Sequence, residues 1–187
     1  MSVAAKPSLR LFFAVWPDTA AREALLRLAR DTQAVAGGRA TAPQSLHVTL
    51  AFLGSVANER LPALAAVAGA VAAAARPFAL TLDRGGGARA RGGVAWIEAA
   101  APPEALLHLQ ARLATGFAEL GFVPDTRRFR PHVTLARKVA AAAVAPACAP
   151  ISWQVTELAL NASEPAPGGS RYSTLATWPL GTASVRG

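Results

Sequence analysis

A five-residue segment occurs twice in this chain of 187 residues. Residues 47–51 and residues 132–136 both read His-Val-Thr-Leu-Ala, so the second copy begins 85 positions after the first (132 minus 47). The chain contains three histidines, and two of them open these copies. For any one pair of histidines, chance agreement at the next four positions is on the order of one in ten thousand, even with so much alanine. Such self-similarity indicates two equivalent structural units.

Each copy has the side-chain pattern of a β-strand with one face in the core. In a strand, residues i and i+2 point to the same face. The first and third residues of each copy therefore lie together, and they are His47 and Thr49 in the first copy and His132 and Thr134 in the second. The valine and leucine of each copy, and Phe52 after the first, are expected to point to the core. Two such strands related by a pseudo-twofold axis would place two imidazoles and two hydroxyls in one cleft.

Two histidines and two threonines in one cleft are suited to displacement at phosphorus. With ordinary pKa values near ~6.5, two histidines share one proton at neutral pH, so one is a base and the other an acid. The attacking and leaving oxygens of an in-line displacement lie on opposite sides of the phosphorus, which suits histidines on facing strands. Each proton transfer contributes roughly 10²–10⁴ to the rate. The hydroxyls of Thr49 and Thr134 are expected to hydrogen-bond the non-bridging oxygens, where charge must be stabilised.

The rest of the chain predicts an α+β fold with largely antiparallel sheets. Strands are expected at residues 9–16, 45–53, 77–84, 94–99, 130–138, 151–160 and 171–180, and helices at residues 19–36, 58–75 and 103–121. The pattern of the first helix places Val35 on its core face, and Gly54 is expected to end the second strand. Residues 84–93, rich in glycine and arginine, are expected to form the turn of a hairpin. Helices and hairpins in this mixed order are typical of the α+β class.

Basic residues gather around the second copy of the repeat. The chain has 19 Lys and Arg residues against 11 Asp and Glu residues, a formal net charge of +8. No acid lies between residues 126 and 138, and the basic residues there are Arg127, Arg128, Arg130, Arg137 and Lys138. Strand alternation places Arg130 on the face of His132 and Arg137 on the opposite face. A second group, in the predicted turn, consists of Arg84, Arg89 and Arg91. We expect an anionic ligand, with Arg130 among the residues that bind it.

Composition excludes several classes of protein. No stretch approaches the roughly 18–20 apolar residues of a membrane-spanning helix. The apolar run at residues 11–16 is shorter than the ~7–15 residues of a signal-peptide core. We therefore expect a cytoplasmic protein with no membrane partner. Cys148 is the only cysteine, so no internal disulfide forms. A metal site needs three or four ligands, and nothing keeps ligand spacing with His47 and His132, so we expect neither a metal nor another cofactor.

The two tetrads and their flanks resemble the two-histidine (2H) phosphoesterase superfamily. Within it, the chain is most similar to the bacterial and archaeal RNA 2′,3′-cyclic phosphodiesterases, once called 2′-5′ RNA ligases. The tetrads are residues 47–50 and residues 132–135. The matching flanks are residues 10–15, residues 46–54, Arg127 with Phe129, residues 131–137, and Tyr172 and Trp178 near the end. The resemblance therefore covers nearly the whole chain.

The resemblance implies a fold and a domain organisation. The fold is bilobal, with two pseudo-symmetric lobes of largely antiparallel sheet, helices on the outside and the active cleft between the lobes. It forms a single domain over residues 1–187. Residues 1–8 are expected to be a loose leader and residues 139–150 a linker rich in alanine and proline, both outside the shared pattern.

The resemblance also implies a reaction. It is the metal-independent hydrolysis of a 2′,3′-cyclic phosphate on RNA or a nucleotide, which leaves a 2′-phosphate. In that pattern His47 is the proton donor to the leaving 3′-oxygen, and His132 is the proton acceptor that activates water. Arg127 and Tyr172 match positions that touch the substrate. We expect the enzyme to be a monomer.

Other interpretations of the same residues stay open at this point. A single histidine on a strand is more often a buried structural residue, and Thr49 and Thr134 are also good strand formers. The arginines near the second tetrad also fit a solvated face, and Phe129 and Tyr172 fit core packing as well as base stacking. Reversible 2′-5′ RNA joining would use the same residues. A third hypothesis is an RNA-end binder without turnover, whose binding would depend strongly on salt.

Overall fold

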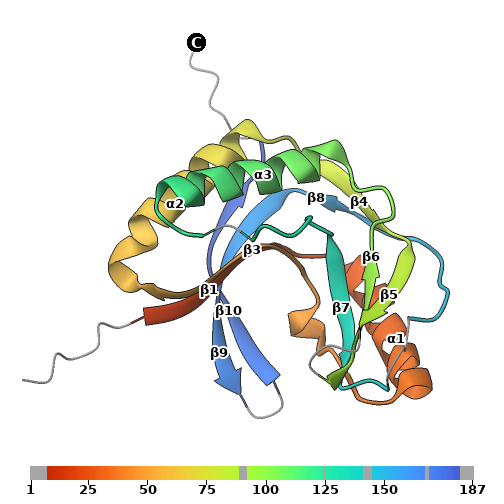
Figure 1. The fold of residues 1–187 in the computed structure, drawn as a ribbon. Coiled ribbons are helices and arrows are strands. Elements are labelled where there is room, and N and C mark those ends of the chain that lie inside the picture. Colours follow the sequence, from red (N-terminus) through yellow and green to blue (C-terminus); the bar gives the residue numbers. More distant parts are fainter. Residues whose placement is uncertain (1–7, 89–91, 124, 141–144, 167–168, 182–187) are drawn as a thin grey trace, which may run out of the picture.

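The computed structural model describes residues 8–88, 92–123, 125–140, 145–166 and 169–181. Figure 1 shows the arrangement of its helices and strands. In chain order they are β1 (Ser8–Val15), α1 (Thr19–Ala36), β2 (Arg39–Ala40), η1 (Pro43–Ser45), β3 (Val48–Ala57), η2 (Asn58–Arg60), α2 (Leu61–Ala74), β4 (Phe78–Leu82), β5 (Arg84–Ala88), β6 (Val94–Glu98), α3 (Glu104–Glu119), β7 (His132–Arg137), β8 (Ile151–Val155), β9 (Glu157–Ala166) and β10 (Gly169–Pro179). The elements η1 and η2 are single 3₁₀ turns.

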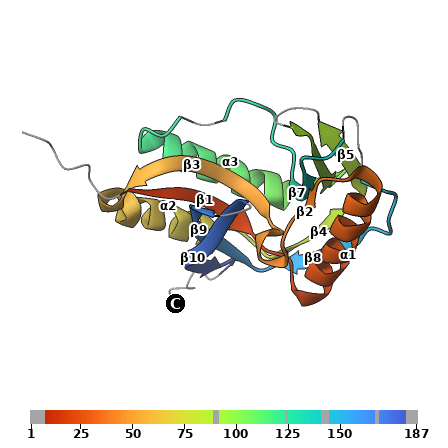
Figure 2. The same cartoon turned by 90° about the horizontal axis from the view of Figure 1, so that it is seen from below.

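Two four-stranded sheets form the framework of the fold. The first has the strand order β10-β9-β1-β3, the second has the order β2-β7-β6-β5, and β4 pairs with β8. Neighbouring strands in these sheets are antiparallel. The helices α2 and α3 lie side by side against the first sheet, and α1 packs against β2 and β7 of the second (Figures 1 and 2). The prediction of an α+β fold with antiparallel sheets and outer helices is confirmed.

The helix α1 has the predicted bounds, but one of its predicted core residues is exposed. The carboxylate of Asp18 accepts a hydrogen bond from the backbone N–H of Ala21 at 2.8 Å, which satisfies a free amide of the first turn. Val35 is 79% exposed, so its predicted place in the core is wrong. In the last turn it is Ala36 that packs onto the second sheet, and Val35 lies beyond the edge of the buried stripe.

The strand after the first tetrad histidine is longer than predicted. It begins at Val48, one residue after His47, and continues to Ala57. Gly54 does not end it, because this residue pairs with Leu11 within the sheet. Its φ of 70° lies in the left-handed region, which glycine reaches without steric cost. The glycine therefore permits an irregularity inside the strand and does not stop it.

The middle strands do not pair as predicted. The strand β4 pairs with β8, and the glycine-rich segment predicted as a turn forms β5, which pairs with β6. A Cβ atom on Gly86 would lie 2.4 Å from Nε1 of Trp96. Glycine at this position therefore leaves room for an indole ring on the sheet, and the glycine-rich segment serves packing. Arg89 and Arg91 of the predicted turn lie outside the described residues.

The strand predicted at residues 151–160 is two strands in different sheets. The chain leaves β8 after Val155 and enters β9 at Glu157. Residues 158–163 of β9 are all buried, because this strand lies between two others in its sheet. The apolar pattern runs on through both strands, so it did not indicate the change of sheet.

One hydrophobic core connects the sheets, the three helices and the β4–β8 pair. Val139 and Ala145 of the predicted linker are buried, while residues 141–144 lie outside the described part of the chain. The predicted leader also lies outside it, except that Ser8 belongs to β1. Within the described residues, none of the helices combines the length and the apolar character needed to cross a membrane.

Candidate active site

Both copies of the repeat line one cleft, although their strands belong to different sheets. The strands β3 and β7 contact each other across the boundary between the sheets. The cleft has a volume of about 1010 Å³, and its lining includes His47, Thr49, His132 and Thr134. The structure thus brings the two imidazoles and the two hydroxyls together, as the repeat predicts.

Each tetrad strand carries a β-bulge at the same position of the repeat. In β3 the extra residue is Leu50, because successive residues of β1 pair with the residues before and after it. In β7 the extra residue is Leu135, by the same comparison with β6. Both leucines are the fourth residue of their tetrad, and both are buried. The two copies therefore share backbone geometry as well as sequence.

The bulges reverse the alternation of side chains after each tetrad. An extra residue in a strand moves the residues that follow it to the other face. Phe52 was expected in the core, but it is 53% exposed and lines the cleft. Arg137 was expected on the face away from His132, but it also lines the cleft. Both lie five positions after their tetrad histidine (52 minus 47, 137 minus 132), so one physical cause corrects both expectations.

The two histidines are oriented by the same kind of hydrogen bond. Nδ1 of His47 lies 2.9 Å from the backbone carbonyl of Ser45, and Nδ1 of His132 lies 2.8 Å from the carbonyl of Arg130. Because a carbonyl can only accept, Nδ1 is the protonated nitrogen that donates in each ring. Nε2 is then the nitrogen available for proton transfer. In His47 it lies 3.1 Å from Oγ1 of Thr49.

Aromatic side chains surround His47. The ring centroids of Phe12 and Trp16 each lie 4.9 Å from the centroid of the imidazole, and that of Tyr172 lies 5.3 Å away. Phe12 lies in β1, Trp16 directly follows the end of β1, and Tyr172 lies in β10, so segments from both neighbours of β9 contribute to this environment. Tyr172, predicted as a substrate residue, also lines the cleft.

Burial lowers the pKa of His47 to about 4, because water no longer stabilises the charged imidazolium. The hydrogen bond to Ser45 raises the pKa, while repulsion from His132 and Arg137 lowers it further. His47 is therefore neutral at pH 7 when the cleft holds no anion. A negatively charged ligand in the cleft would favour the protonated ring.

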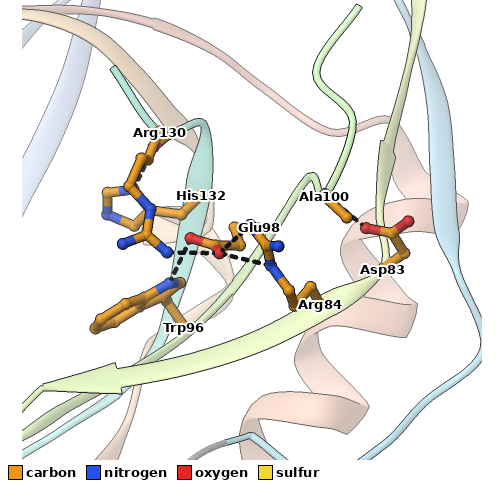
Figure 3. A network of polar contacts seen from close by, with 7 residues as sticks. All are labelled: Asp83, Arg84, Trp96, Glu98, Ala100, Arg130 and His132. Carbon is orange, nitrogen blue, oxygen red and sulfur yellow. Dashed lines mark hydrogen bonds and ion pairs between the residues drawn. The ribbon is translucent and has the colours of Figure 1, made fainter. Parts of the chain in front are cut away.

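The second histidine is exposed, and a buried carboxylate lies beside it (Figure 3). Glu98 is opposite His132 in the pairing of β6 with β7, and its side chain is 3% exposed. It accepts hydrogen bonds from Nη2 of Arg130 at 2.7 Å, Nε of Arg84 at 2.9 Å and Nε1 of Trp96 at 3.0 Å. Burial by itself raises the pKa of Glu98, but these donors outweigh it and hold the pKa below its usual value. Glu98 is therefore ionised.

The cleft is strongly basic. Its basic lining residues are Arg10, Arg39, Arg137, Lys138 and Arg171, and its lining among the described residues includes no Asp or Glu. A cleft lined by charges of one sign concentrates ligands of the opposite sign. The lining thus favours an anionic substrate.

A second hollow adjoins the cleft at His132. It has a volume of about 640 Å³ and shares Thr49, Phe52 and His132 with the cleft. The predicted substrate residues Arg127 and Arg130 line this hollow and not the cleft.

Two carboxylates hold these arginines. Nη2 of Arg127 lies 2.5 Å from Oδ2 of Asp125, and this pairing lowers the pKa of Asp125 to about 2. Arg130 donates to Glu98, as described above. Contacts of either arginine with substrate stay predictions.

Sequence analysis missed several residues of the site, and Arg137 and Glu98 are two of them. Arg137 was assigned to the wrong face because a bulge cannot be recognised from alternation alone. Glu98 was not considered, although it is the only acid in the predicted strand 94–99. A single acid in an apolar strand, in a chain with a basic segment elsewhere, is the signal that would have indicated a buried ion pair.

Ligands for a metal ion do not gather at this site. Across the described parts of the chain, no three His, Cys, Asp or Glu residues are grouped so that they could hold one.

Comparisons with known proteins match this chain over most of its length. The model of the "2'-5' RNA ligase superfamily" matches residues 16–164. The RNA 2′,3′-cyclic phosphodiesterase of Escherichia coli is 37% identical over 172 residues, which cover 91% of this chain and 96% of that protein. The protein of the same name from Thermus thermophilus is 34% identical over 181 residues, covering 92% and 90%. The crystal structure of E. coli LigT complexed with 3′-AMP superposes with a TM-score of 0.83 at 36% identity, covering 93% of this chain and 99% of that one.

Proposed function

This chain belongs to the 2′-5′ RNA ligase superfamily, and from that premise we propose that it is an RNA 2′,3′-cyclic phosphodiesterase. It is an enzyme that hydrolyses the 2′,3′-cyclic phosphate at the end of an RNA or of a nucleotide. The observation that carries this proposal is the meeting of both tetrads in one basic cleft. The names of the E. coli and T. thermophilus relatives support the same reaction.

The two histidines divide the proton transfers. Nε2 of His132 takes a proton from water as the water oxygen bonds to phosphorus. Nε2 of His47 gives a proton to the 3′-oxygen as the bond between this oxygen and phosphorus breaks. The product is a 2′-phosphomonoester with a free 3′-hydroxyl. Because each Nδ1–H is held by a backbone carbonyl, Nε2 is the atom that each ring presents for these transfers.

Other lining residues stabilise the charge that develops on the phosphate. The hydroxyls of Thr49 and Thr134 donate to the non-bridging oxygens, and Arg137 adds a positive charge on the same face. Tyr172 lies against the ring of His47 and bounds the place of the substrate. Arg127 and Arg130 contact the nucleotide only if it extends into the second hollow, which they line.

The low pKa of His47 sets a condition on its role as proton donor. A donor must carry a proton, and His47 in the empty cleft is neutral at pH 7 because its pKa is about 4. The substrate phosphate brings a negative charge next to the ring, which raises the pKa on binding. Titration of His47 by NMR with and without inorganic phosphate measures this effect. If phosphate leaves the pKa near 4, His47 is the base and His132 the acid.

Phosphorus NMR of 2′,3′-cyclic AMP tests the proposed reaction. We expect protein treated with EDTA to convert the cyclic phosphate to the 2′-monoester, because all the groups that transfer protons belong to the chain. A variant that combines His47→Ala with His132→Ala is the control. No conversion by the wild type, or activity that EDTA removes and a metal restores, would contradict the proposal.

A second candidate reaction is the joining of two RNA ends through a 2′-5′ linkage. The second hollow favours it, since it opens beside His132, where the nucleophile enters. A 5′-hydroxyl there would replace water, give its proton to His132 and bond to phosphorus while the 3′-oxygen leaves. An RNA with a cyclic end is incubated with a second RNA that carries a 5′-hydroxyl. Joined product on a denaturing gel supports this reaction, and hydrolysis alone contradicts it.

Three further proposals come from sequence analysis. We propose that residues 1–187 act as one domain, that the protein is a monomer and that it works in the cytoplasm. Light scattering coupled to size-exclusion chromatography tests the second of these, with 19.2 kDa expected for one chain.

A further inference from the structure

The two histidines of the repeat are fixed in place by different means. Around His47, the rings of Phe12, Trp16 and Tyr172 leave the imidazole little room to turn. His132 is exposed, so packing restrains it less, although it is the proton acceptor in the proposed reaction. The pseudo-symmetry of the tetrads does not extend to what surrounds them.

Two contacts orient the ring of His132, and both involve a residue that binds Glu98. The first is the carbonyl of Arg130, which accepts the Nδ1–H. The guanidinium of the same Arg130 donates to Oε1 of Glu98. The second is the ring of Trp96, whose centroid lies 5.9 Å from that of the imidazole. The indole N–H of the same Trp96 donates to Oε2 of Glu98.

Figure 3 shows that one carboxylate thus connects the two supports of a single imidazole. Each oxygen of Glu98 holds one of them, and Arg84 adds a third donor from β5. Gly86, also on β5, leaves the space in which the Trp96 ring lies.

The buried negative charge of Glu98 is not explained by a contribution to the stability of the fold. Moving a carboxylate out of water is unfavourable, and apolar residues of similar volume often replace a buried ion pair without loss of stability. A geometric role explains why a carboxylate occupies this position, because apolar side chains would hold neither the guanidinium nor the indole N–H.

We propose that Glu98 is the positioning residue for His132, which it holds through Arg130 and Trp96 so that Nε2 points into the cleft. This inference rests on the proposed function for the role of His132 as proton acceptor. Glu98 does not touch the substrate phosphate in this proposal. A misplacement of about 1 Å in a reacting group costs on the order of a hundredfold in rate.

The substitution Glu98→Gln tests the proposal, because it keeps the shape of the side chain and removes its charge. We expect kcat for 2′,3′-cyclic AMP to fall by about 10- to 100-fold. KM should change less than about twofold, since Glu98 binds Arg84, Trp96 and Arg130 and not Thr49, Thr134 or Arg137, the residues proposed to bind the phosphate in the cleft. The matched control is Asp83→Asn, which removes a carboxylate that accepts from the backbone N–H of Ala100 in the same region. Its kcat should equal that of the wild type. Equal kcat values for Glu98→Gln and the wild type would overturn the proposal.

A spectroscopic measurement tests the same claim without turnover. Nitrogen-15 NMR of the imidazoles distinguishes a proton on Nδ1 from a proton on Nε2. In the wild type, both His47 and His132 should show the Nδ1–H form. In Glu98→Gln, His132 should become a mixture of the two forms while His47 stays unchanged. If the wild type shows no activity, the proposed reaction fails, and this experiment still decides the role of Glu98.

The substitution Trp96→Phe provides a second variant in case Glu98→Gln does not fold. It keeps an aromatic ring beside His132 and removes the N–H that donates to Glu98. We expect an intermediate loss of kcat and a smaller change in the NMR signal of His132. Signals of His132 identical to those of the wild type in Trp96→Phe would overturn the part of the proposal that concerns the indole.

Discussion

His47 and His132 have the same hydrogen bond to the backbone and opposite surroundings. Each donates Nδ1–H to the carbonyl two residues before it. His47 lies among aromatic rings that lower its pKa to about 4 through burial, whereas His132 is exposed and next to residues held by Glu98. Without a ligand the low pKa favours His47 as a base, so its proposed role as proton donor requires the substrate phosphate to raise that pKa. The asymmetry lies in the neighbours of the repeat and not in the repeat.

Replacement of either tetrad histidine should abolish most of the activity. We expect His47→Ala and His132→Ala each to lower kcat/KM by at least about a hundredfold, because each removes one proton transfer. Initial rates with a 2′,3′-cyclic nucleotide measure this. His108→Ala is the control, since that histidine is exposed on α3. Wild-type rates in either tetrad variant would remove the assignment of acid and base.

Burial of neutral His47 should make the protein less stable in mild acid. The pKa of His47 is about 4 in the folded chain against an ordinary value of 6.5, so the unfolded state binds the proton first as the pH falls. The free energy of unfolding should therefore fall as the pH decreases from 6.5 to 4, by as much as about 3 kcal/mol from this residue. Urea unfolding at a series of pH values measures the effect. His47→Gln should show a shallower pH dependence, and equal slopes in both proteins would contradict the explanation.

At the scale of secondary structure, the bulge at the fourth tetrad residue of each strand decides which of the following side chains reach the cleft. The extra residues Leu50 and Leu135 turn Phe52 and Arg137 toward the cleft. Bulges next to active sites commonly redirect a side chain in this way. Arg137 then contributes the only guanidinium of β7 to the cleft among the described residues.

Two helical glycines should respond differently to replacement by alanine, because only Gly116 lies where α3 packs closely against α2. A Cβ on Gly116 would lie 2.6 Å from Cγ1 of Val67, whereas one on Gly69 would meet its nearest atom, in Trp178, at 3.4 Å. Gly116→Ala should therefore destabilise the fold by about 1–3 kcal/mol through overpacking. Gly69→Ala should leave the stability unchanged or raise it by up to about 1 kcal/mol through helix propensity. Thermal unfolding of both variants measures the difference, and the reverse order would show that the helices separate easily.

At the scale of the whole molecule, the lobes bring charge from distant segments to one place. Arg10 on β1, Arg137 on β7 and Arg171 on β10 line the cleft together, and none of them is near another in the sequence. Because the cleft lies between the two sheets, arginines from both of them contribute to its positive electrostatic potential. Such a field draws in polyanions and weakens with salt.

Added salt should therefore raise KM for an RNA substrate, because several basic residues of the cleft contribute to binding it. We expect log KM for an oligonucleotide with a 2′,3′-cyclic end to rise linearly with log salt concentration. Arg171→Gln should lower the slope by up to about 0.7, the value for one phosphate contact on a single strand. Arg27→Gln, on the exposed face of α1, should leave the slope unchanged. Equal salt slopes of log KM in the wild type and both variants would show that the RNA does not contact Arg171.

The sequence by itself determined the parts of this protein that depend on local pattern. Repetition of one segment identified His47, Thr49, His132 and Thr134, because side chains at i and i+2 of a strand share a face whatever the rest of the chain does. Apolar periodicity likewise located the three helices, since a buried stripe recurs at fixed intervals along a helix. The resemblance to a known family added the reaction and the two-lobed shape.

Only the tertiary structure decided the features that depend on which segments meet. Strand pairing placed β5 where a turn was expected and divided residues 151–160 between two sheets, because pairing is a choice between distant partners that alternation does not record. The bulges that bring Arg137 to the cleft arise from the register between strands. Glu98 acquires its place beside His132 for the same reason, since the residues that bind it come from two strands, β5 and β6, and from the loop before β7. The residue types of the tetrads are a local property of the sequence. The neighbours that shift the pKa of His47 and orient the ring of His132 come from distant segments, so only the tertiary structure brings them together.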